Sequence, residues 1–325
     1  MLDIVITHYK EPYEVGEKIF RMIALQRCIN FDDIRVIVIN DGGQRLPEEK
    51  LAELPYPVEQ MDIPHGGISA ARNAGIENAV NPWIMFCDFD DNFASIFSLR
   101  EIMNTLKTDE YDMLWSRVIA EDYMDGKEML YYIPERQRFV FCHGKVYRTQ
   151  FLHESNTRFD TELVFNEDSC FNAVIIARTP HTRIGEIRSP LPIYCWIRRP
   201  NSVTNSGRED EASYGHFKRN MKVTHEYENG DHRYYGMVTR TVYDTYYMVF
   251  GKRNSMQMRR RILDEFTPWI TERIKDFGRV DTLTLEEIRK ISRMELIEPD
   301  EIIPDDYRTI AKWVNNLVDI YRGVG

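Results

Sequence analysis

The sequence predicts an α/β fold, with a doubly wound and mostly parallel sheet followed by a helical C-terminal region. Two apolar runs, Ile34 to Asn40 and Trp83 to Cys87, have the composition of strands that are covered on both faces. Segments with helical periodicity lie between the strand-like segments, as expected when strands and helices alternate. The 325 residues are enough for two domains, and 43% hydrophobic residues are enough for their cores.

Four strands and two helices of this sheet can be placed in order along the chain. The strands are expected at Leu2 to Thr7, Ile34 to Asn40, Val58 to Ile63 and Trp83 to Cys87. The segments with helical spacing are Tyr13 to Cys28 and Ile68 to Ala79. A later strand is expected at Leu191 to Ile197. In such a sheet, ligands bind beyond the carboxyl ends of the strands.

The composition changes near residue 205, which divides the chain into residues 1–205 and residues 206–325. We expect Asn205 to Glu211 to be a linker and the rest to be helical, with interruptions at Gly251 and Pro268. The expected helices are Tyr243 to Gly251, Arg259 to Phe277, one opened by the capping box of Thr284 and Glu287 and running to Met294, and Asp305 to Arg322. The last helix has a large apolar stripe that is expected to be buried against the first domain or another subunit, and residues 206–325 are expected to bind a ligand or to build a homo-oligomer.

Charge is unevenly distributed along the chain. The net charge of −10 disfavours general adhesion to nucleic acid. The stretch from Tyr214 to Arg261 nevertheless has ten basic and four acidic residues, a net charge of +6, which leaves −16 for the rest. Seven tyrosines are interleaved with those basic residues. Basic and aromatic side chains together suit an anionic polymer that carries sugars or bases, and the alternative is a solvated helix face.

The cysteines indicate a reducing compartment. There are five of them, without paired spacing: Cys28, Cys87, Cys142, Cys170 and Cys195. This arrangement is typical of reduced thiols in a cytosolic protein. The sequence has neither a signal-peptide pattern nor an apolar run of about 18 residues, so we expect a cytoplasmic protein without a transmembrane segment.

An acidic turn follows the fourth expected strand. Asp88, Asp90 and Asp91 place three carboxylates within four residues. Because like charges at a strand end repel one another, they need a cation or a solvated turn. Oxygen ligands suit Mg²⁺ or Mn²⁺, and the usual partner of such an ion is a phosphate. The alternative interpretation is an acidic surface loop.

Other candidates follow the second strand and precede the second helix. Asp41 can accept hydrogen bonds from a base or a ribose, and the alternative is an aspartate that forms a turn. Gly66 and Gly67 before a helix offer backbone N–H groups to an anion. Arg72 can bind a phosphate through two N–H groups, and the alternative is a solvated arginine on the helix surface.

Several short motifs occur in an order and spacing that resemble a known family. They are Thr7, residues 40–43 (NDGG), residues 66–75 (GGISAARNAG), residues 88–91 (DFDD), residues 139–152, 158–160 and 166–168, and residues 194–204 (YCWIRRPNSVT). Together they resemble the family 2 glycosyltransferases, which are inverting nucleotide-diphosphosugar transferases of the GT-A fold. The resemblance covers residues 1–205. It departs at Gly43, where many members have a serine, and at His8-Tyr9, where small residues are common.

The resemblance implies a donor site for a nucleotide-diphosphosugar, with a UDP-sugar expected. Asp41 would hold the base, Arg72 would reach the base or the pyrophosphate, and Asp88 would contact the ribose or the sugar. Asp90 would bind the metal, Mn²⁺ or Mg²⁺. The full set expected to bind the nucleotide sugar is Thr7, Asp41, Arg72, Asp88, Arg198 and Ser202. The last two would close over the phosphates, and the alternative is a polar loop.

The resemblance also implies a catalytic base at Glu167 or Asp168. An acceptor hydroxyl must lose its proton as it attacks, so the reaction requires a general base. Apolar neighbours at Phe165 and Cys170 provide a setting that raises the pKa of a carboxyl. The family pattern assigns the base to Asp168, and Glu167 is the alternative. One displacement opposite the leaving group would invert the anomeric centre. His143 is expected to be a structural histidine, with contact to the sugar or acceptor as the alternative.

The main hypothesis is therefore an inverting, metal-dependent glycosyltransferase of the hexosyltransferase type. A sugar nucleotidyltransferase and a non-catalytic glycan- or polymer-binding module are the alternatives. The loop HYKEP lacks the glycine-rich sequence of the former, and the presence of Asp90 and Asp168 disfavours the latter. The acceptor is expected to be a growing glycan, a wall polymer such as teichoic acid, or modified DNA, bound by residues 206–325.

Overall fold

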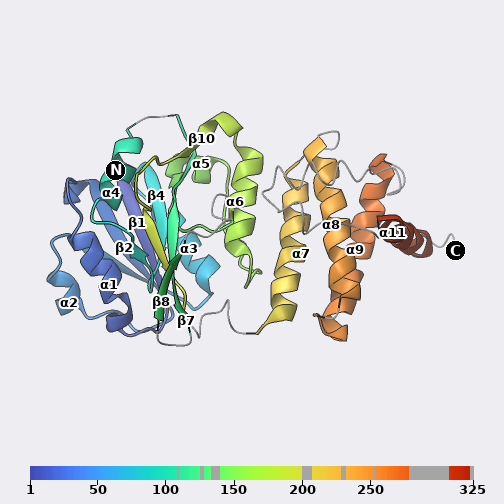
Figure 1. Cartoon of the computed structure of the whole chain (residues 1–325), viewed down its shortest axis with the longest axis horizontal. Coiled ribbons are helices and arrows are strands. Elements are labelled where there is room, and N and C mark those ends of the chain that lie inside the picture. The colour runs from blue at the N-terminus through green and yellow to red at the C-terminus, as the bar shows by residue number, and fades with distance from the viewer. Residues whose placement is uncertain are drawn as a thin grey trace. The chain divides into compact units, whose positions relative to one another are not determined.

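The computed structural model describes residues 1–107, 110–124, 128–132, 140–199, 207–227, 232–251, 253–277 and 307–322, and the following account concerns these residues. The chain divides into two compact units (Figure 1). The first consists of residues 1–162 and 167–206, and the second of residues 163–166 and 207–325. Each unit has a hydrophobic core of its own.

The first unit is built on a seven-stranded sheet with the order β10-β6-β9-β4-β1-β2-β3. Its strands are β1 (Leu2–His8), β2 (Ile34–Asp41), β3 (Val58–Ile63), β4 (Trp83–Asp88), β6 (Met113–Trp115), β9 (Lys145–Arg148) and β10 (Ile184–Glu186). All neighbouring pairs are parallel except those of β9 with β4 and with β6. The predicted α/β fold with a mostly parallel sheet is thus confirmed.

Helices cover both faces of this sheet. They are α1 (Tyr13–Ala24), α2 (Glu48–Ala52), α3 (Ile68–Glu77), α4 (Ser98–Thr105), α5 (Thr149–Glu154) and α6 (Glu167–Arg178). Side chains alternate along β1, so Leu2, Ile4 and Ile6 pack in the cluster that contains α1 residues. Val5 points the other way, into the cluster formed with α3 and α6. Figure 1 shows α1 and α6 on opposite sides of the strands.

A second, four-stranded sheet joins the acidic turn to a later segment. Its order is β5 (Asn92–Phe93), β11 (Tyr194–Ile197), β7 (Val118–Met124) and β8 (Glu128–Tyr132). The predicted strand at Leu191 to Ile197 therefore begins three residues later than expected. Antiparallel pairing of β5 with β11 places Tyr194 opposite Phe93, directly after the three aspartates. The turn is thereby fixed to a strand about 100 residues away in sequence.

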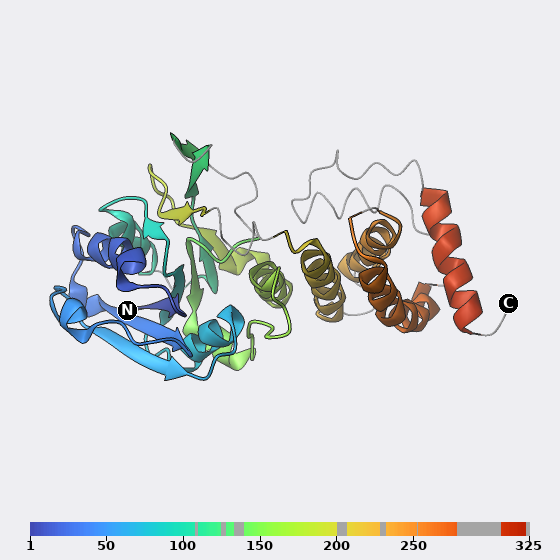
Figure 2. The ribbon, with the colours of Figure 1, turned by 90° about the horizontal axis from the view of Figure 1, so that it is seen from below.

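The second unit is helical. It consists of α7 (Glu209–His225), α8 (His232–Phe250), α9 (Met256–Phe277) and α11 (Tyr307–Tyr321), together with residues 163–166. Helices α7, α8 and α9 run side by side, and α11 crosses them at a steep angle (Figures 1 and 2). The α11 stripe of Ile310, Val314 and Val318 is buried in the core of this unit, so the expectation that it needs the first domain or another subunit for burial was wrong. Trp313 stacks on Phe266 of α9 with ring centroids 5.6 Å apart.

Some predicted boundaries were wrong. The predicted helix Tyr13 to Cys28 ends at Ala24, and Cys28 has a left-handed φ of 60° that an α-helix cannot contain. The expected linker is partly helical, because α7 begins at Glu209 and has acidic residues in its first turn, where the helix dipole favours them.

Two helices of the second unit are longer than predicted. Helix α8 begins at His232 and not at Tyr243. Pro268 does not interrupt α9, since buried Phe266, Trp269 and Ile270 hold the helix on both sides of it. The predicted helix opened by Thr284 lies outside the described residues. Among the described helices, none is long and apolar enough to span a membrane. All five cysteines have free thiols.

Candidate active site

The acidic turn lies between β4 and β5, at the carboxyl end of the central sheet. Its backbone is closed by the N–H of Asp91, which donates to the carbonyl of Asp88 at 3.1 Å. The Asp91 carboxylate is buried, and it accepts hydrogen bonds from the Tyr194 hydroxyl at 3.0 Å and from the backbone N–H of Ile197 at 2.8 Å. Two partners, at the two ends of β11, thus fix the position of this carboxylate.

Each carboxylate of the turn faces a different basic side chain. Arg72 donates to Asp88 at 2.9 Å, Arg199 lies 2.5 Å from Asp90, and His143 Nδ1 lies 3.5 Å from Asp91. Burial raises the pKa of Asp91 well above its usual range, and the charges of Asp88 and Asp90 raise it further. Burial and Asp88 also raise the pKa of Asp90. The raised pKa values mean that the surrounding residues do not fully offset the negative charges of Asp90 and Asp91.

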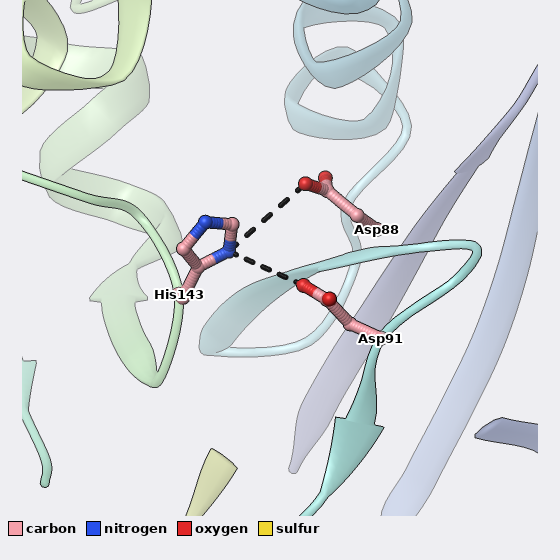
Figure 3. A group of neighbouring side chains, drawn as sticks. All are labelled: Asp88, Asp91 and His143. Atoms are coloured by element: carbon pink, nitrogen blue, oxygen red, sulfur yellow. Dashed lines mark ion pairs between the residues drawn. The ribbon is translucent and has the colours of Figure 1, made fainter. Parts of the chain in front are cut away.

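His143 points into this group of carboxylates from the loop before β9 (Figure 3). Its ring stacks on Tyr194 and on Trp196, with centroids 5.7 Å away in both cases. Burial lowers the pKa of His143, which favours the neutral ring that binds metals. Its Nδ1 is buried and makes no hydrogen bond among the described residues. The expectation of a structural histidine with satisfied hydrogen bonds was therefore wrong for this atom.

Asp88, Asp91 and His143 together form a group that could hold a metal ion. One ligand atom from each of the three lies within 4.8 Å of the others. Carboxylate oxygens with one imidazole nitrogen suit a divalent ion such as Mn²⁺. Asp90, the predicted metal ligand, is held by Arg199, so its role at a metal stays a prediction.

Arg72 connects this group to the candidate base. Its side chain is 2% exposed and bridges Asp88, at 2.9 Å, and Glu167, at 3.0 Å. The alternative of a solvated arginine was therefore wrong. The guanidinium also lies over the Phe159 ring, 5.2 Å from its centroid. Contact of Arg72 with a nucleotide stays a prediction, because both of its observed ion pairs join protein carboxylates.

Glu167 and Asp168 lie in the first turn of α6. Burial raises the pKa of Glu167 to about 7, and the neighbouring Asp168 raises it too, against the opposing effect of Arg72. Asp168 accepts a hydrogen bond from the backbone N–H of Ser169 at 2.7 Å. One carboxylate is thus tied to a buried arginine, while the other is held by the backbone of its own helix. Which of the two is the base stays a prediction.

Thr7 and Asp41 lie at the same edge of the sheet as the acidic turn. Thr7 is opposite Asp88 in the pairing of β1 with β4. Asp41 ends β2, and its carboxylate accepts hydrogen bonds from the backbone N–H groups of Gly66, at 2.7 Å, and Gly67, at 2.9 Å. Asp41 thereby fixes the glycine loop before α3, and its contact with a base stays a prediction.

The two departures from the family pattern meet beside Asp41. A Cβ atom added at Gly43 would lie 1.3 Å from the carbonyl oxygen of Tyr9, so no side chain fits there. Tyr9 in turn stacks on His65, with centroids 4.3 Å apart. The glycine at position 43 and the tyrosine at position 9 therefore belong to one local structure.

Arg198 is not brought to the acidic turn. It donates to Asp122 of β7 at 2.8 Å and lies over the Trp196 ring, 5.4 Å from its centroid. Ser202 lies outside the described residues. The predicted contacts of both residues with phosphates stay predictions.

Comparison with known proteins settles the family. The family model described as glycosyl transferase family 2 matches residues 3–173, which is more than half of the chain. The chain belongs to glycosyl transferase family 2. This membership makes it a glycosyltransferase, as the sequence motifs predicted.

Curated relatives of this glycosyltransferase agree with the family. One is the uncharacterized glycosyltransferase EpsJ of Bacillus subtilis, 24% identical over 209 residues, with 55% of this chain and 59% of EpsJ covered. Another is a teichoic acid poly(glycerol phosphate) polymerase of Staphylococcus epidermidis, 31% identical over 113 residues, with 32% and 15% covered. The chain spans about three-fifths of the length of EpsJ and of YwdF, the other B. subtilis relative.

Solved structures share the fold of this glycosyltransferase. S. aureus TarS 1-349 in complex with UDP has a TM-score of 0.62 and 14% identity, and the match covers 100% of this chain and 92% of TarS. The complex of TarS 1-349 with UDP-GlcNAc has a TM-score of 0.63 and 18% identity, with 99% and 92% covered. At such identities the likeness supports the GT-A-like fold alone.

The sequence predictions did not include two contributions to the candidate metal group. Asp91 was seen as one charge of the acidic turn, whereas the structure makes it a buried member of the candidate metal group. His143 was assigned a structural role, although it precedes Gly144, whose φ of 64° turns the chain sharply at this point. That turn was the available signal that His143 points into the site.

Proposed function

We propose that this glycosyltransferase transfers a sugar from a UDP-sugar, with a divalent cation, to an acceptor hydroxyl and inverts the anomeric centre. The proposal rests on a connected series of charged side chains. His143 lies next to both Asp91 and Asp88, and Arg72 pairs with both Asp88 and Glu167. The series joins a group suited to a cation with a pair of carboxylates suited to proton transfer. Both parts lie in the first unit.

The donor proposal rests on the sheet edge and on the related structures. Thr7, Asp41 and Asp88 end neighbouring strands, where nucleotide ligands bind in open α/β sheets. TarS, which has the same fold, was crystallised with UDP and with UDP-GlcNAc. We therefore expect UDP to bind at this edge, with its base near Asp41.

The residues present fit a divalent cation. The unsatisfied, buried Nδ1 of His143 next to Asp88 and Asp91 is an arrangement that a metal ion would complete. These three residues would hold the ion, with Asp90 as a further ligand, and Mn²⁺ or Mg²⁺ is the expected species. A bound cation would offset the negative charge that develops on the departing nucleoside diphosphate.

Asp168 is the proposed general base. It would accept the proton of the acceptor hydroxyl while Glu167, held by Arg72, keeps the first turn of α6 in place. Glu167, whose pKa is raised to about 7, is the alternative base. Attack by the hydroxyl opposite the leaving group gives inversion in a single displacement.

The acceptor is proposed to be a glycan or an anionic polymer bound by the second unit. Lys218 and Arg261 flank the Tyr214 ring, at 5.9 and 3.9 Å from its centroid, and both lie near Glu265. One of the relatives is a polymerase of teichoic acid, a polymer with charged phosphates. Modified DNA as the acceptor, a homo-oligomer through the C-terminal helices and a cytoplasmic location also stay predictions.

Release of UDP from a panel of UDP-sugars, with and without Mn²⁺, tests the donor and the cation together. We expect slow hydrolysis of one UDP-sugar that depends on added Mn²⁺ and accelerates with the right acceptor. Hydrolysis of a GDP-sugar in preference would contradict the donor, and equal rates after chelation would contradict the cation. The anomeric configuration of the product, read by NMR, tests inversion.

A further inference from the structure

Two consecutive arginines after β11 bind different partners. Arg199 forms an ion pair with Asp90 of the acidic turn at 2.5 Å, whereas Arg198 forms one with Asp122 of β7 at 2.8 Å. Both arginines follow Ile197, whose backbone N–H is bonded to Asp91. The segment is therefore fixed beside the turn, and it directs one positive charge into the turn and the other away from it.

The ion pair of Arg199 with Asp90 differs from the other two contacts in the turn. Arg72 is 2% exposed and also holds Glu167, so its position is set by two carboxylates. Asp91 is 1% exposed and has hydrogen bonds to Tyr194 and to the backbone. Arg199 and Asp90 are 40% and 20% exposed, which makes their pair the most accessible of the three. It is thus the pair that another cation can displace most easily.

We propose that Arg199 sets the affinity of the acidic turn for a divalent cation by occupying Asp90 while no cation is bound. The inference rests on the proposed function, in that it takes this turn to be the cation site. A guanidinium and a divalent cation compete for the same carboxylate and repel each other at short range. The cation must therefore displace Arg199 before Asp90 can serve as a ligand. Arg199 would lower the affinity for the free ion and leave tight binding to conditions in which a diphosphate supplies additional ligands.

Titration with Mn²⁺ in the absence of nucleotide tests this inference. Free Mn²⁺ would be measured by its EPR signal for the full-length wild type and for Arg199→Gln, Arg199→Lys and Arg198→Gln. We expect Arg199→Gln to bind Mn²⁺ at least about fivefold more tightly, because one competing positive charge is removed. Arg199→Lys keeps the charge and should remain near the wild type. Arg198→Gln is the matched control and should also remain near the wild type, since Arg198 pairs with Asp122.

Three results would overturn the inference. They are an Arg199→Gln affinity equal to or below that of the wild type, an equal gain in Arg198→Gln, and no Mn²⁺ binding by any of the proteins. Thermal melts of each variant show whether it is folded, and Arg199→Met, which also removes the charge, replaces the glutamine variant in the test if the latter is unfolded. Tighter Mn²⁺ binding without any sugar transfer would support the inference and contradict the proposed function. Mn²⁺-dependent sugar transfer, together with an Arg199→Gln variant that binds free Mn²⁺ no more tightly than the wild type, would do the reverse.

Discussion

The acidic turn of the first unit and the Asp244 cluster of the second unit use the same residue types with opposite results. Asp244 of α8 receives hydrogen bonds from His216, Asn220 and Arg240, at 2.8, 2.7 and 2.6 Å. Although burial raises its pKa, Arg240 and His216 lower it below the usual range. In the acidic turn, Arg72 and His143 likewise lower the pKa of Asp88 against the effect of burial, but the pKa values of Asp90 and Asp91 are raised.

The two sites differ in the number of hydrogen-bond donors that are available to each carboxylate. One carboxylate that accepts three hydrogen bonds at its Oδ2 atom has its negative charge offset by its neighbours, so the Asp244 cluster is suited to stabilise the fold. Three carboxylates within four residues repel one another and leave a histidine nitrogen unsatisfied, so the acidic turn is suited to a cation. Residue type alone does not separate a structural cluster from a functional one.

Among the variants that test this comparison, Asp90→Asn is expected to have the largest effect on activity. Loss of a carboxylate that the reaction needs should abolish sugar transfer, while removal of one repelling charge should leave the fold intact. Transfer assays in Mn²⁺ and thermal melts check both parts. A variant with near-normal activity would show that the turn does not need this carboxylate.

A second test extends the comparison to the carboxylates at α6. Asp168→Asn should slow transfer at least about 10²-fold, the usual scale for the loss of a general base. Binding of UDP, measured by calorimetry, should survive because Asp168 would contact the acceptor and not the nucleotide. Equal losses of UDP binding and transfer would instead assign Asp168 a structural role.

Stability measurements test whether the Asp244 cluster is more important to the fold than the acidic turn is. Asp244→Asn leaves Arg240 and His216 without their counter-charge, so the free energy of unfolding should fall by about 3 kcal/mol. Asp91→Asn is the matched variant, and it should cost less stability because it removes one of three like charges. Urea unfolding of both variants decides the matter. If Asp91→Asn costs as much as Asp244→Asn, the two clusters are equally structural.

The raised pKa of Glu167 predicts a pH dependence of stability. Its pKa is 4.5 in an ordinary setting and about 7 in the folded chain, so the folded state binds the proton more tightly. The contribution of Glu167 to stability is therefore present below about pH 4.5 and is lost as the pH rises through about 7. Urea unfolding between pH 5 and 8 should show this decline, and Glu167→Gln should flatten it. An unchanged slope in the variant would assign the decline to other groups.

The smallest effect is expected on the basic surface of the second unit. Changing Arg259, Arg260 and Arg261 to Glu should raise the Michaelis constant for a polyanionic acceptor several-fold, and less so at high salt. Donor hydrolysis should not change. Replacing the same three residues by Gln is the control, and its effect should be about half as large. Normal transfer by the Glu variant at low salt would mean that these arginines form a solvated helix face.

The central sheet was predictable because its strands are buried on both faces. The β3 strand was predicted at its observed bounds, and β1, β2 and β4 each end one residue later than expected. Several of the missed elements are short, such as α2 with five residues and β5 with two. Such elements depend on tertiary contacts, because a few residues carry too little periodicity to indicate them.

The candidate site was predictable wherever charge itself was the signal. The three aspartates and the Glu167-Asp168 pair stand out in the sequence. The partner of each charge was not predictable, because Arg72 meets Glu167 across 95 positions and Arg199 meets Asp90 across more than 100. His143 was missed for a related reason, since its surroundings come from β4 and β11.

The contact between Gly43 and Tyr9 limits what can be transferred from one family member to another. With the Tyr9 carbonyl in its observed place, a serine at position 43 is impossible, and a chain with that serine must route its first loop differently. The residue at position 43 and the path of the loop after β1 are therefore coupled. An inhibitor shaped to fit this loop would discriminate against a protein whose loop follows another path.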